Sequence, residues 1–305
     1  MPAPKIASHR LTPYLLLTLA PLFWAANMVL GRAMRNDIPP VAMSFWRWAL
    51  AGLILLPFVW GDLRKHAPVI LREWKVLAAL GTLSVTLFNT LCYIGLQWTT
   101  ATNGTLFNSL IPVLIVLLAW LVLRERVTRQ QALGVAISLG GVLTIVAQGS
   151  LAVLLGLHFN DGDLWLLAAM ALWAGYTVVL RWRPAELTGL TFLACIIYCG
   201  LPLLTLAYAW ELGTRRGFQP TPQVVLTLVY YGLFPSILSN LCFNAGVKAV
   251  GPNRAGIFAH LMPVFGILLS TALLGERLHG YHLAGMTLVF LGIWLTTAAR
   301  TPAAR

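Results

Sequence analysis

The chain has 305 residues, of which 59% are hydrophobic and 10% are charged, and its formal net charge is +12 at pH 7. A soluble domain carries roughly 25% charged residues, so this composition excludes a water-soluble globular enzyme and a disordered chain. With only four cysteines, a disulfide scaffold is excluded as well. We therefore expect a helical protein that crosses a membrane several times.

Long apolar runs predict ten membrane-spanning helices. A bilayer core about 30 Å thick needs about 20 apolar residues per helix. The ten runs lie near residues 12–31, 38–60, 73–97, 100–123, 129–148, 163–181, 187–210, 222–247, 254–274 and 280–299. The loops between them are too short to fold by themselves, and no phosphate-binding loop of the Walker type occurs. ATP-driven pumping by this chain alone is therefore excluded.

The distribution of lysine and arginine predicts how the chain sits in the membrane. If the N-terminus is cytoplasmic, fifteen of the 21 basic residues face the cytoplasm and five face the outside. Such a bias is what the positive-inside rule describes. We expect a multi-pass protein of the inner membrane with both termini in the cytoplasm. The net charge then reflects this orientation, and we expect no nucleic-acid partner.

The two halves of the sequence resemble each other at a shift of 151 residues. Residues 89–97 align with residues 240–248, and the shift also pairs Pro112 with Pro263 and the Glu-Arg step at 125–126 with that at 276–277. Each half, 1–150 and 151–305, holds five predicted spans. Because five is odd, the second half must enter the membrane upside down relative to the first. The predicted fold is all-α, with ten transmembrane helices arranged as two inverted five-helix repeats.

Three segments resemble a known family. They are LVLRERVTRQQALGVAISLGGVLTIV (121–146), ALLGERLHGYHLAGMTLVFLGIWLT (272–296) and FWRWALAGLILLPF (45–58). Together they are similar to the EamA branch of the drug/metabolite transporter superfamily, over nearly the whole chain. The resemblance implies a ten-helix exporter or facilitator of small metabolites, often amino acids. YddG-like exporters of aromatic amino acids are one subgroup.

Ionisable groups are scarce within the predicted spans. All nine acids lie in loops or at span ends, which favours facilitated diffusion, or coupling through a histidine, over coupling through a carboxylate. Arg47 is the one charged residue well inside a span. It can be a counter-charge for a substrate carboxylate, or a structural arginine that binds backbone carbonyls or reaches outward to the interface.

Two matched prolines, Pro112 and Pro263, lie in the middle of the fourth and ninth predicted spans. Each removes a backbone donor and frees the carbonyl four residues earlier, at Asn108 and Ala259. We interpret them as hinges next to a cavity, with a simple packing kink as the alternative. His260 is the only histidine in the middle of a span, and it is either pH-sensitive or a satisfied structural side chain.

Aromatic and amide side chains recur at matching places in the two halves. Asn89 and Asn240 are either substrate ligands or interhelical contacts that hold the halves together. Ala132, Ala136 and Gly140 form a small-residue stripe for close helix packing, or a dimer surface. The predicted substrate-binding residues are Trp24, Asn27, Arg47, Asn89, Tyr93, Phe107, Asn108, Trp173, Tyr176, Asn240, Phe258 and His260, with Pro112 and Pro263 as hinges.

These patterns predict a transporter that exports amino acids, aromatic ones included, or similar small metabolites by alternating access. It would work as a facilitator or a weakly coupled carrier, with no enzymatic activity, cofactor or metal. Its partners would be the solute and the lipid bilayer, and we expect a monomer, with a homodimer as the alternative. Other functions left open are export of drugs or other metabolites, flipping of lipid-linked substrates, and a membrane scaffold that transports nothing.

Overall fold

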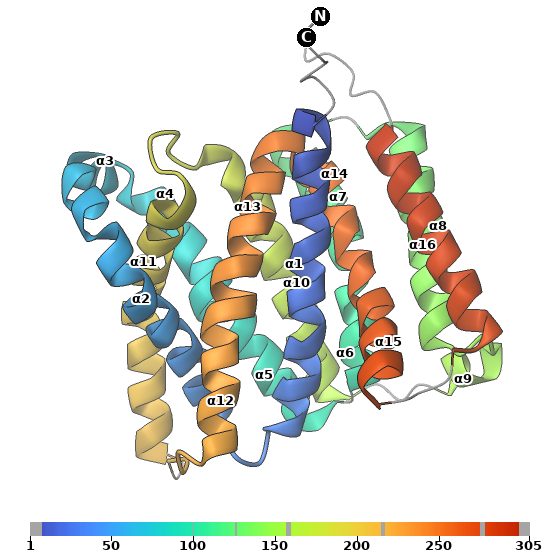
Figure 1. The fold of residues 1–305 in the computed structure, drawn as a ribbon, viewed down its shortest axis with the longest axis horizontal. Helices are drawn as coiled ribbons and strands as arrows, with labels where there is room; N and C mark the ends of the chain where they lie inside the picture. The colour runs from blue at the N-terminus through green and yellow to red at the C-terminus, as the bar shows by residue number, and fades with distance from the viewer. Residues whose placement is uncertain are drawn as a thin grey trace, which may run out of the picture.

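The computed structural model describes residues 8–99, 101–125, 127–156, 160–214, 217–274 and 278–298. Throughout this part the chain forms a bundle of helices without any strand (Figure 1). Nine of the described helices are long and apolar enough to cross a membrane. The predicted all-α membrane fold is confirmed.

The first half contains five predicted spans, one of which includes a π-helical segment. Its elements are α1 (Ser8–Ala33), α2 (Pro40–Lys65), α3 (Ala67–Arg72), α4 (Trp74–Gly81), the π-helix η1 (Thr82–Phe88), α5 (Asn89–Trp98), α6 (Ala101–Asn108), α7 (Ile111–Leu123) and α8 (Arg129–Val146). Helices α4, η1 and α5 follow one another without a break and form the third span.

The second half repeats this order of elements, and its third span is again interrupted by a π-helix. Its elements are α9 (Leu151–Leu155), α10 (Asp161–Val179), the 3-10 helix η2 (Leu180–Trp182), α11 (Gly189–Thr214), α12 (Pro222–Tyr231), the π-helix η3 (Gly232–Leu238), α13 (Ser239–Val250), α14 (Pro252–Gly256), the 3-10 helix η4 (Ile257–His260), α15 (Leu261–Leu274) and α16 (Gly280–Ala298).

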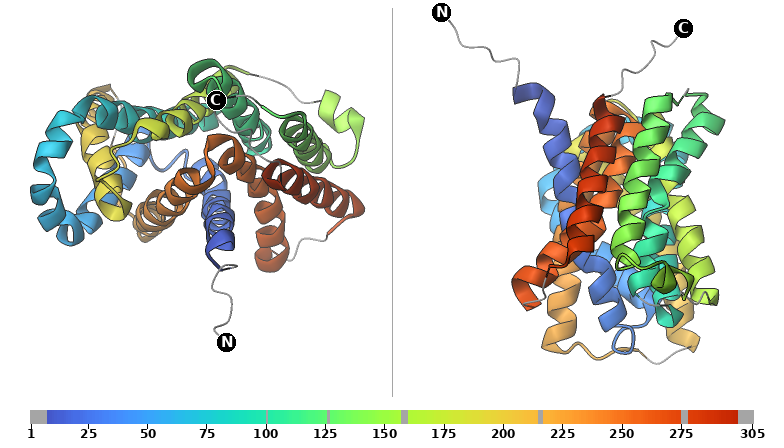
Figure 2. Two further views of the ribbon diagram at one scale, coloured as in Figure 1. Left: turned by 90° about the horizontal axis from the view of Figure 1, so that it is seen from above. Right: turned by 90° about the vertical axis from the view of Figure 1, so that its right-hand side faces the viewer.

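The ninth predicted span differs from a plain helix. It consists of α14, η4 and α15, so the α-helical path is divided by a 3-10 segment, and no single described helix there meets the length of a membrane span. The number of ten crossings therefore stays a prediction. Helix α1 begins and α16 ends at the same end of the bundle (Figures 1 and 2), which is the arrangement that an even number of crossings produces.

The second spans of the two halves, α2 and α11, run antiparallel. Near the start of α2, the backbone N–H groups of Val41 and Ala42 donate to the Glu211 carboxylate at 3.1 and 2.7 Å, and Glu211 is near the end of α11. Near the other end of α2, the Thr191 hydroxyl donates to Asp62 at 3.2 Å. Corresponding helices of the two halves therefore point in opposite directions, as an inverted repeat requires.

The fifth spans, α8 and α16, pack against each other through glycine backbones. A Cβ atom on Gly134 would lie 2.7 Å from the Gly292 carbonyl oxygen, and one on Gly141 would lie 2.6 Å from that of Gly285. The contacts pair early residues of α8 with late residues of α16, so these helices are also antiparallel. Only glycine permits such an approach. The pair lies side by side at one edge of the bundle (Figure 1).

The predicted stripe of small residues on α8 does not make this contact. Ala132 and Ala136 are exposed, and a Cβ atom on Gly140 would meet no other atom within 4 Å. The prediction that this stripe serves close packing inside the chain is wrong, because the helix turns the glycines at 134 and 141 toward α16 instead. The alternative, a dimer surface on this stripe, stays a prediction.

Candidate functional site

Two asparagines stabilise the π-helical segments at equivalent places. The Asn89 side-chain nitrogen Nδ2 donates to the Ser84 carbonyl at 3.0 Å, and Asn240 Nδ2 donates to the Pro235 carbonyl at 3.1 Å. Both bonds reach five residues back, which is the spacing of a π-turn. They lie within one span each, so these two bonds hold the π-turns and do not join the halves. Such π-bulges inside helices are frequent at functional sites.

A cavity lies between the two halves, next to both π-helices. The space between its lining atoms is about 450 Å³, counting the part that opens to the outside. It is lined by Trp24, Asn27, Arg47, Phe88, Asn89, Asn108, Ile111, Trp173, Asn240, Ala259 and Met262. Helices of both halves contribute to this lining. A mostly apolar cavity with a few polar groups is the usual form of a small-molecule site.

Arg47 is the polar centre of the cavity. Its side chain is only 2% exposed, yet it donates hydrogen bonds from two of its three nitrogens. Nη1 donates to Asn89 Oδ1 at 2.7 Å, to the Tyr93 hydroxyl at 3.0 Å and to Asn27 Oδ1 at 3.1 Å. Nε donates to the Ser236 hydroxyl at 2.6 Å. Asn27, Asn89 and Tyr93 belong to the first half and Ser236 to the second, so Arg47 connects the halves.

The positive charge of Arg47 is not neutralised by a carboxylate. All its hydrogen-bond acceptors are neutral, and within the described ranges the ion pairs found are those of Arg72 with Glu73 and Glu186. The guanidinium carbon lies 5.1 Å from the ring centre of Trp48 and 5.8 Å from that of Tyr231. Nη2 makes no hydrogen bond to any residue that the structure describes, although a guanidinium carries five N–H donors.

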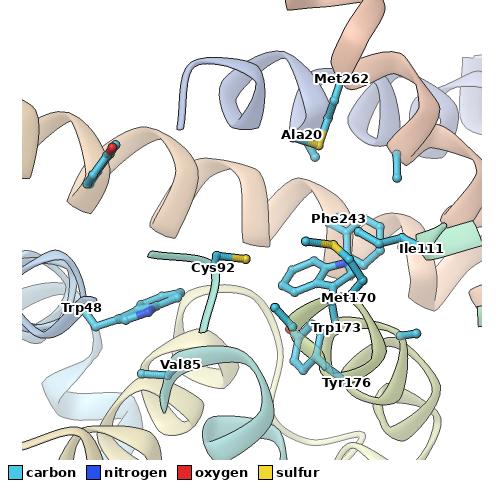
Figure 3. Close-up of a cluster of buried hydrophobic side chains, with 14 of the residues drawn as sticks. Ala20, Trp48, Val85, Cys92, Ile111, Met170, Trp173, Tyr176, Phe243 and Met262 are labelled. Carbon is cyan, nitrogen blue, oxygen red and sulfur yellow. The ribbon is translucent and has the colours of Figure 1, made fainter. Parts of the chain in front are cut away.

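Aromatic side chains form the apolar wall of the cavity. The rings of Trp24 and Trp173 meet edge to face, with their centres 5.1 Å apart. Trp173 also packs against Phe88 at 4.7 Å and Tyr176 at 5.0 Å. Figure 3 shows Trp173 beside Tyr176 and Phe243 in this cluster. The equivalent tryptophans of the two halves therefore meet at the centre of the molecule.

Each half contains a buried tyrosine–asparagine pair, with the two residue types exchanged. In the first half, the Tyr93 hydroxyl on α5 donates to Asn27 Oδ1 on α1 at 2.9 Å. In the second half, the Tyr176 hydroxyl on α10 donates to Asn244 Oδ1 on α13 at 2.7 Å. The first and third spans of each half are thus held by the same bond with donor and acceptor reversed. Only the first-half pair reaches Arg47.

The fourth and ninth spans break next to the cavity. Helix α6 ends at Asn108 and α7 begins at Ile111, and the equivalent break in the other half is the 3-10 helix η4. Pro112 and Pro263 follow directly after these breaks. Asn108 and Ala259, whose carbonyls the prolines free, both line the cavity. The predicted kinks are present, and their role as hinges stays a prediction.

His260 lies outside the cavity lining and is fully buried. Its Nε2 lies 2.7 Å from the Ser109 carbonyl oxygen and its Nδ1 lies 2.6 Å from the Ser138 hydroxyl. Because a carbonyl can only accept, Nε2 donates, and Nδ1 of the neutral ring accepts from Ser138. His260 therefore ties the break in the fourth span to α8.

The structure brings most of the predicted site residues together. Seven of them line the cavity: Trp24, Asn27, Arg47, Asn89, Asn108, Trp173 and Asn240. Tyr93 lies behind them as a hydrogen-bond partner of Asn27 and Arg47, and Tyr176 packs against Trp173. Phe107, Phe258 and His260 are not part of the lining. Residues that the sequence did not single out are Phe88, Ile111 and Met262 in the lining and Ser236 and Tyr231 at Arg47. The motif residues Arg126, Glu276 and Arg277 lie outside the described residues.

Comparison with known proteins agrees with this architecture. The model of the EamA-like transporter family matches residues 11–147 and 160–298. The uncharacterized transporter YyaM of Bacillus subtilis (strain 168) is 28% identical over 92% of this chain and 92% of its own length. Protein PecM of Dickeya dadantii (strain 3937) is 26% identical over 89% of this chain and 87% of its own.

A solved crystal structure shares the fold, with a TM-score of 0.75 at 18% identity over 94% of this chain and 96% of the other. Since the family model matches two successive segments that together cover most of the sequence, the family assignment does not depend on any single motif. The chain belongs to the EamA-like transporter family and is therefore a multi-pass membrane transporter rather than an enzyme.

Proposed function

We propose that this transporter exports amino acids, or similar small metabolites that carry a carboxylate, across the inner membrane by alternating access. The observation that carries the proposal is the buried charge of Arg47, which lines the cavity and has neutral partners only. A charge buried in a low-dielectric site is costly unless an opposite charge is nearby. A solute with a carboxylate supplies that charge.

The geometry of the guanidinium supports direct contact with the solute. Nε and Nη1 are occupied by protein acceptors, which fix the orientation of the group, and the two N–H donors of Nη2 remain for a ligand. A preorganised donor that needs no rearrangement on binding favours affinity. Arg47 does not match the structural alternative of the sequence analysis, because its acceptors are side chains rather than backbone carbonyls and it is buried. We therefore propose it as the counter-charge for the solute.

The remaining lining supports a facilitator or a weakly coupled carrier. No carboxylate occurs among the residues that line the described cavity. The buried acids Asp163 and Glu211 instead bind backbone N–H groups at helix ends. The described cavity lining therefore offers no carboxylate through which transport could be coupled to protons or sodium. Inverted halves around a central site are suited to alternating access, and we place both termini in the cytoplasm.

Counterflow of labelled amino acids into proteoliposomes tests the proposal. We compare the wild type with Arg47→Gln and Arg47→Lys, using L-phenylalanine, L-leucine and their methyl esters, which lack the carboxylate charge. A hydrogen bond to a charged group contributes about 1.5–3 kcal/mol, so Arg47→Gln should weaken binding of the amino acids about 10- to 100-fold. Binding of the esters should change little, and Arg47→Lys should be intermediate.

Arg32→Gln is the matched control. Arg32 donates to the carbonyls of Leu96 and Gln97 at the end of α5 and does not line the cavity, so its loss should leave affinity for the amino acids unchanged. Folding of every variant is checked by size-exclusion chromatography. A folded Arg47→Gln protein that binds amino acids as tightly as the wild type would refute the proposal.

A further inference from the structure

Asn240 differs from its counterpart Asn89 in the bonding of its side-chain oxygen. The side-chain oxygen of Asn89 accepts from Arg47, whereas Oδ1 of Asn240 has no hydrogen-bond partner among the described residues. The two ends of the Asn240 amide are not interchangeable, because Nδ2 donates to the carbonyls of Pro235 at 3.1 Å and Ser236 at 3.0 Å. The free atom is therefore the acceptor.

This free acceptor belongs to a side chain that is buried and lines the cavity. Asn240 is 2% exposed, and it is one of the lining residues. Buried polar atoms in proteins nearly always have a partner, and an exception calls for an explanation. Here the missing partner is a donor, so the group that completes the site carries an N–H or an O–H.

The surroundings of Asn240 favour a positively charged donor. Trp24 and Trp173 line the same cavity, and the negative faces of indole rings attract ammonium groups. The indole N–H of Trp24 already donates to the Pro235 carbonyl at 3.2 Å, which fixes this ring beside the π-helix that Asn240 closes.

One residue connects Asn240 with Arg47. The Ser236 hydroxyl accepts from Arg47 Nε at 2.6 Å, and the Ser236 carbonyl accepts from Asn240 Nδ2 at 3.0 Å. A guanidinium with free donors and an amide with a free acceptor therefore lie on either side of Ser236. An α-amino acid carries its carboxylate and its ammonium group on the same carbon atom, so one small ligand can reach both groups.

We propose that Asn240 Oδ1, together with the tryptophan rings, binds the ammonium group of a zwitterionic solute whose carboxylate lies at Arg47. This inference rests on the proposed function and adds to it a second recognition point, on the opposite half of the molecule. The cavity then selects amino acids over simple carboxylic acids. A hydrogen-bonding site rejects an analogue that lacks the matching group because its own polar atom is left unpaired.

The test compares each amino acid with the same molecule lacking the amino group. The pairs are L-phenylalanine with 3-phenylpropionate and L-leucine with 4-methylpentanoate, and binding to the purified full-length protein is measured by calorimetry. In the wild type the amino acid should bind about 10- to 100-fold more tightly than its partner, since the lost bond involves a charged group. This ratio of two affinities is measured on the wild-type protein alone.

Asn240→Ala then shows which residue produces the ratio. Any general damage to the π-helix weakens both members of a pair equally, whereas loss of the ammonium contact weakens only the amino acid, so the ratio should fall to near one. Asn240→Ser, whose hydroxyl can still donate to the π-helix carbonyls, serves if the alanine variant fails to fold. Asn244→Ala is the matched control, because Asn244 is buried on the same helix but does not line the cavity, and the ratio should persist.

The outcomes separate this inference from the proposed function. If the wild type binds both members of a pair equally, or if the ratio survives in Asn240→Ala, the ammonium contact is wrong while a carboxylate at Arg47 still stands. An acceptor that holds only an ordered water would give this result. If the wild type binds neither member, or if Arg47→Gln binds both as tightly as the wild type, the proposed function fails as well.

Discussion

Replacing Gly141 by alanine tests how closely the fifth spans pack. The new Cβ atom would lie 2.6 Å from the Gly285 carbonyl oxygen and 2.8 Å from the Val289 nitrogen. Both are backbone atoms and cannot rotate away. Ordinary contact begins at 3.4 Å, so α8 and α16 must separate by about 0.8 Å along this contact. Such overpacking typically costs about 1–3 kcal/mol.

The neighbouring glycine supplies the control. Gly140→Ala makes the same chemical change in the same helix, but no atom lies within 4 Å of the new methyl group. Both substitutions gain about 1 kcal/mol of helix propensity, which cancels in the comparison. Gly141→Ala should therefore be less stable than Gly140→Ala by about 1–3 kcal/mol.

Thermal unfolding of the detergent-purified variants measures this difference. For domains of 150–250 residues, 1 kcal/mol corresponds to a change in Tm of about 2–4 °C, so we expect a gap of a few degrees or more. Neither glycine lines the cavity, and amino acid affinity should be retained in both proteins. If Gly141→Ala melts at or above the temperature of Gly140→Ala, the backbone contact between α8 and α16 is not as close as described.

Two further substitutions test buried polar contacts by the same measurement. Glu211→Gln replaces one of the two acceptors that bind Val41 and Ala42 and removes a negative charge from the start of α2, so it should destabilise the protein by about 1–3 kcal/mol. An unchanged Tm would mean that the carboxylate does not cap the helix. Ser138→Ala leaves the buried Nδ1 of His260 without its donor and should cost about 1–3 kcal/mol. Unaltered stability would show that this bond contributes nothing.

The sequence predicted the membrane fold well because span length and apolarity are local properties. In the ninth span, Pro263 predicted a break, but it did not predict that the four residues before the next helix would form the 3-10 segment η4. The prediction that Ala132, Ala136 and Gly140 pack against a neighbouring helix was wrong. Spacing shows which residues share a face, but it does not show which face meets the neighbour. The glycines that do meet it, Gly134 and Gly141, recur at the repeat shift in Gly285 and Gly292.

The cavity was predictable where the repeat marked equivalent residues. Trp24 with Trp173 and Asn89 with Asn240 were found in this way, and all four line the cavity. Ser236 was missed, because its bond to Arg47 joins residues 189 positions apart. One signal was present, since Ser236 lies one helical turn before Asn240 and shares its face. The π-turn that brings the two together has no recognisable sequence pattern.

The two halves of the fold are related by an inverted repeat, but only the first half contributes a charged residue, Arg47, to the described cavity lining. These two features have different consequences for transport. In the proposed alternating access, one inverted repeat moves against the other around the central site, and we expect the equivalent tryptophans to remain in contact at the centre in both states. Arg47 has no charged counterpart in the lining contributed by the second half. Three of its partners belong to the first half and one, Ser236, to the second. In the proposed mechanism the guanidinium should therefore stay with the first half during this movement, and a solute bound at Nη2 would meet the same charge from either side of the membrane. In this proposal, a solute that also reaches Asn240 makes polar contacts with both halves, so its binding is coupled to their relative position, whereas a simple carboxylic acid makes its polar contact with the first half alone.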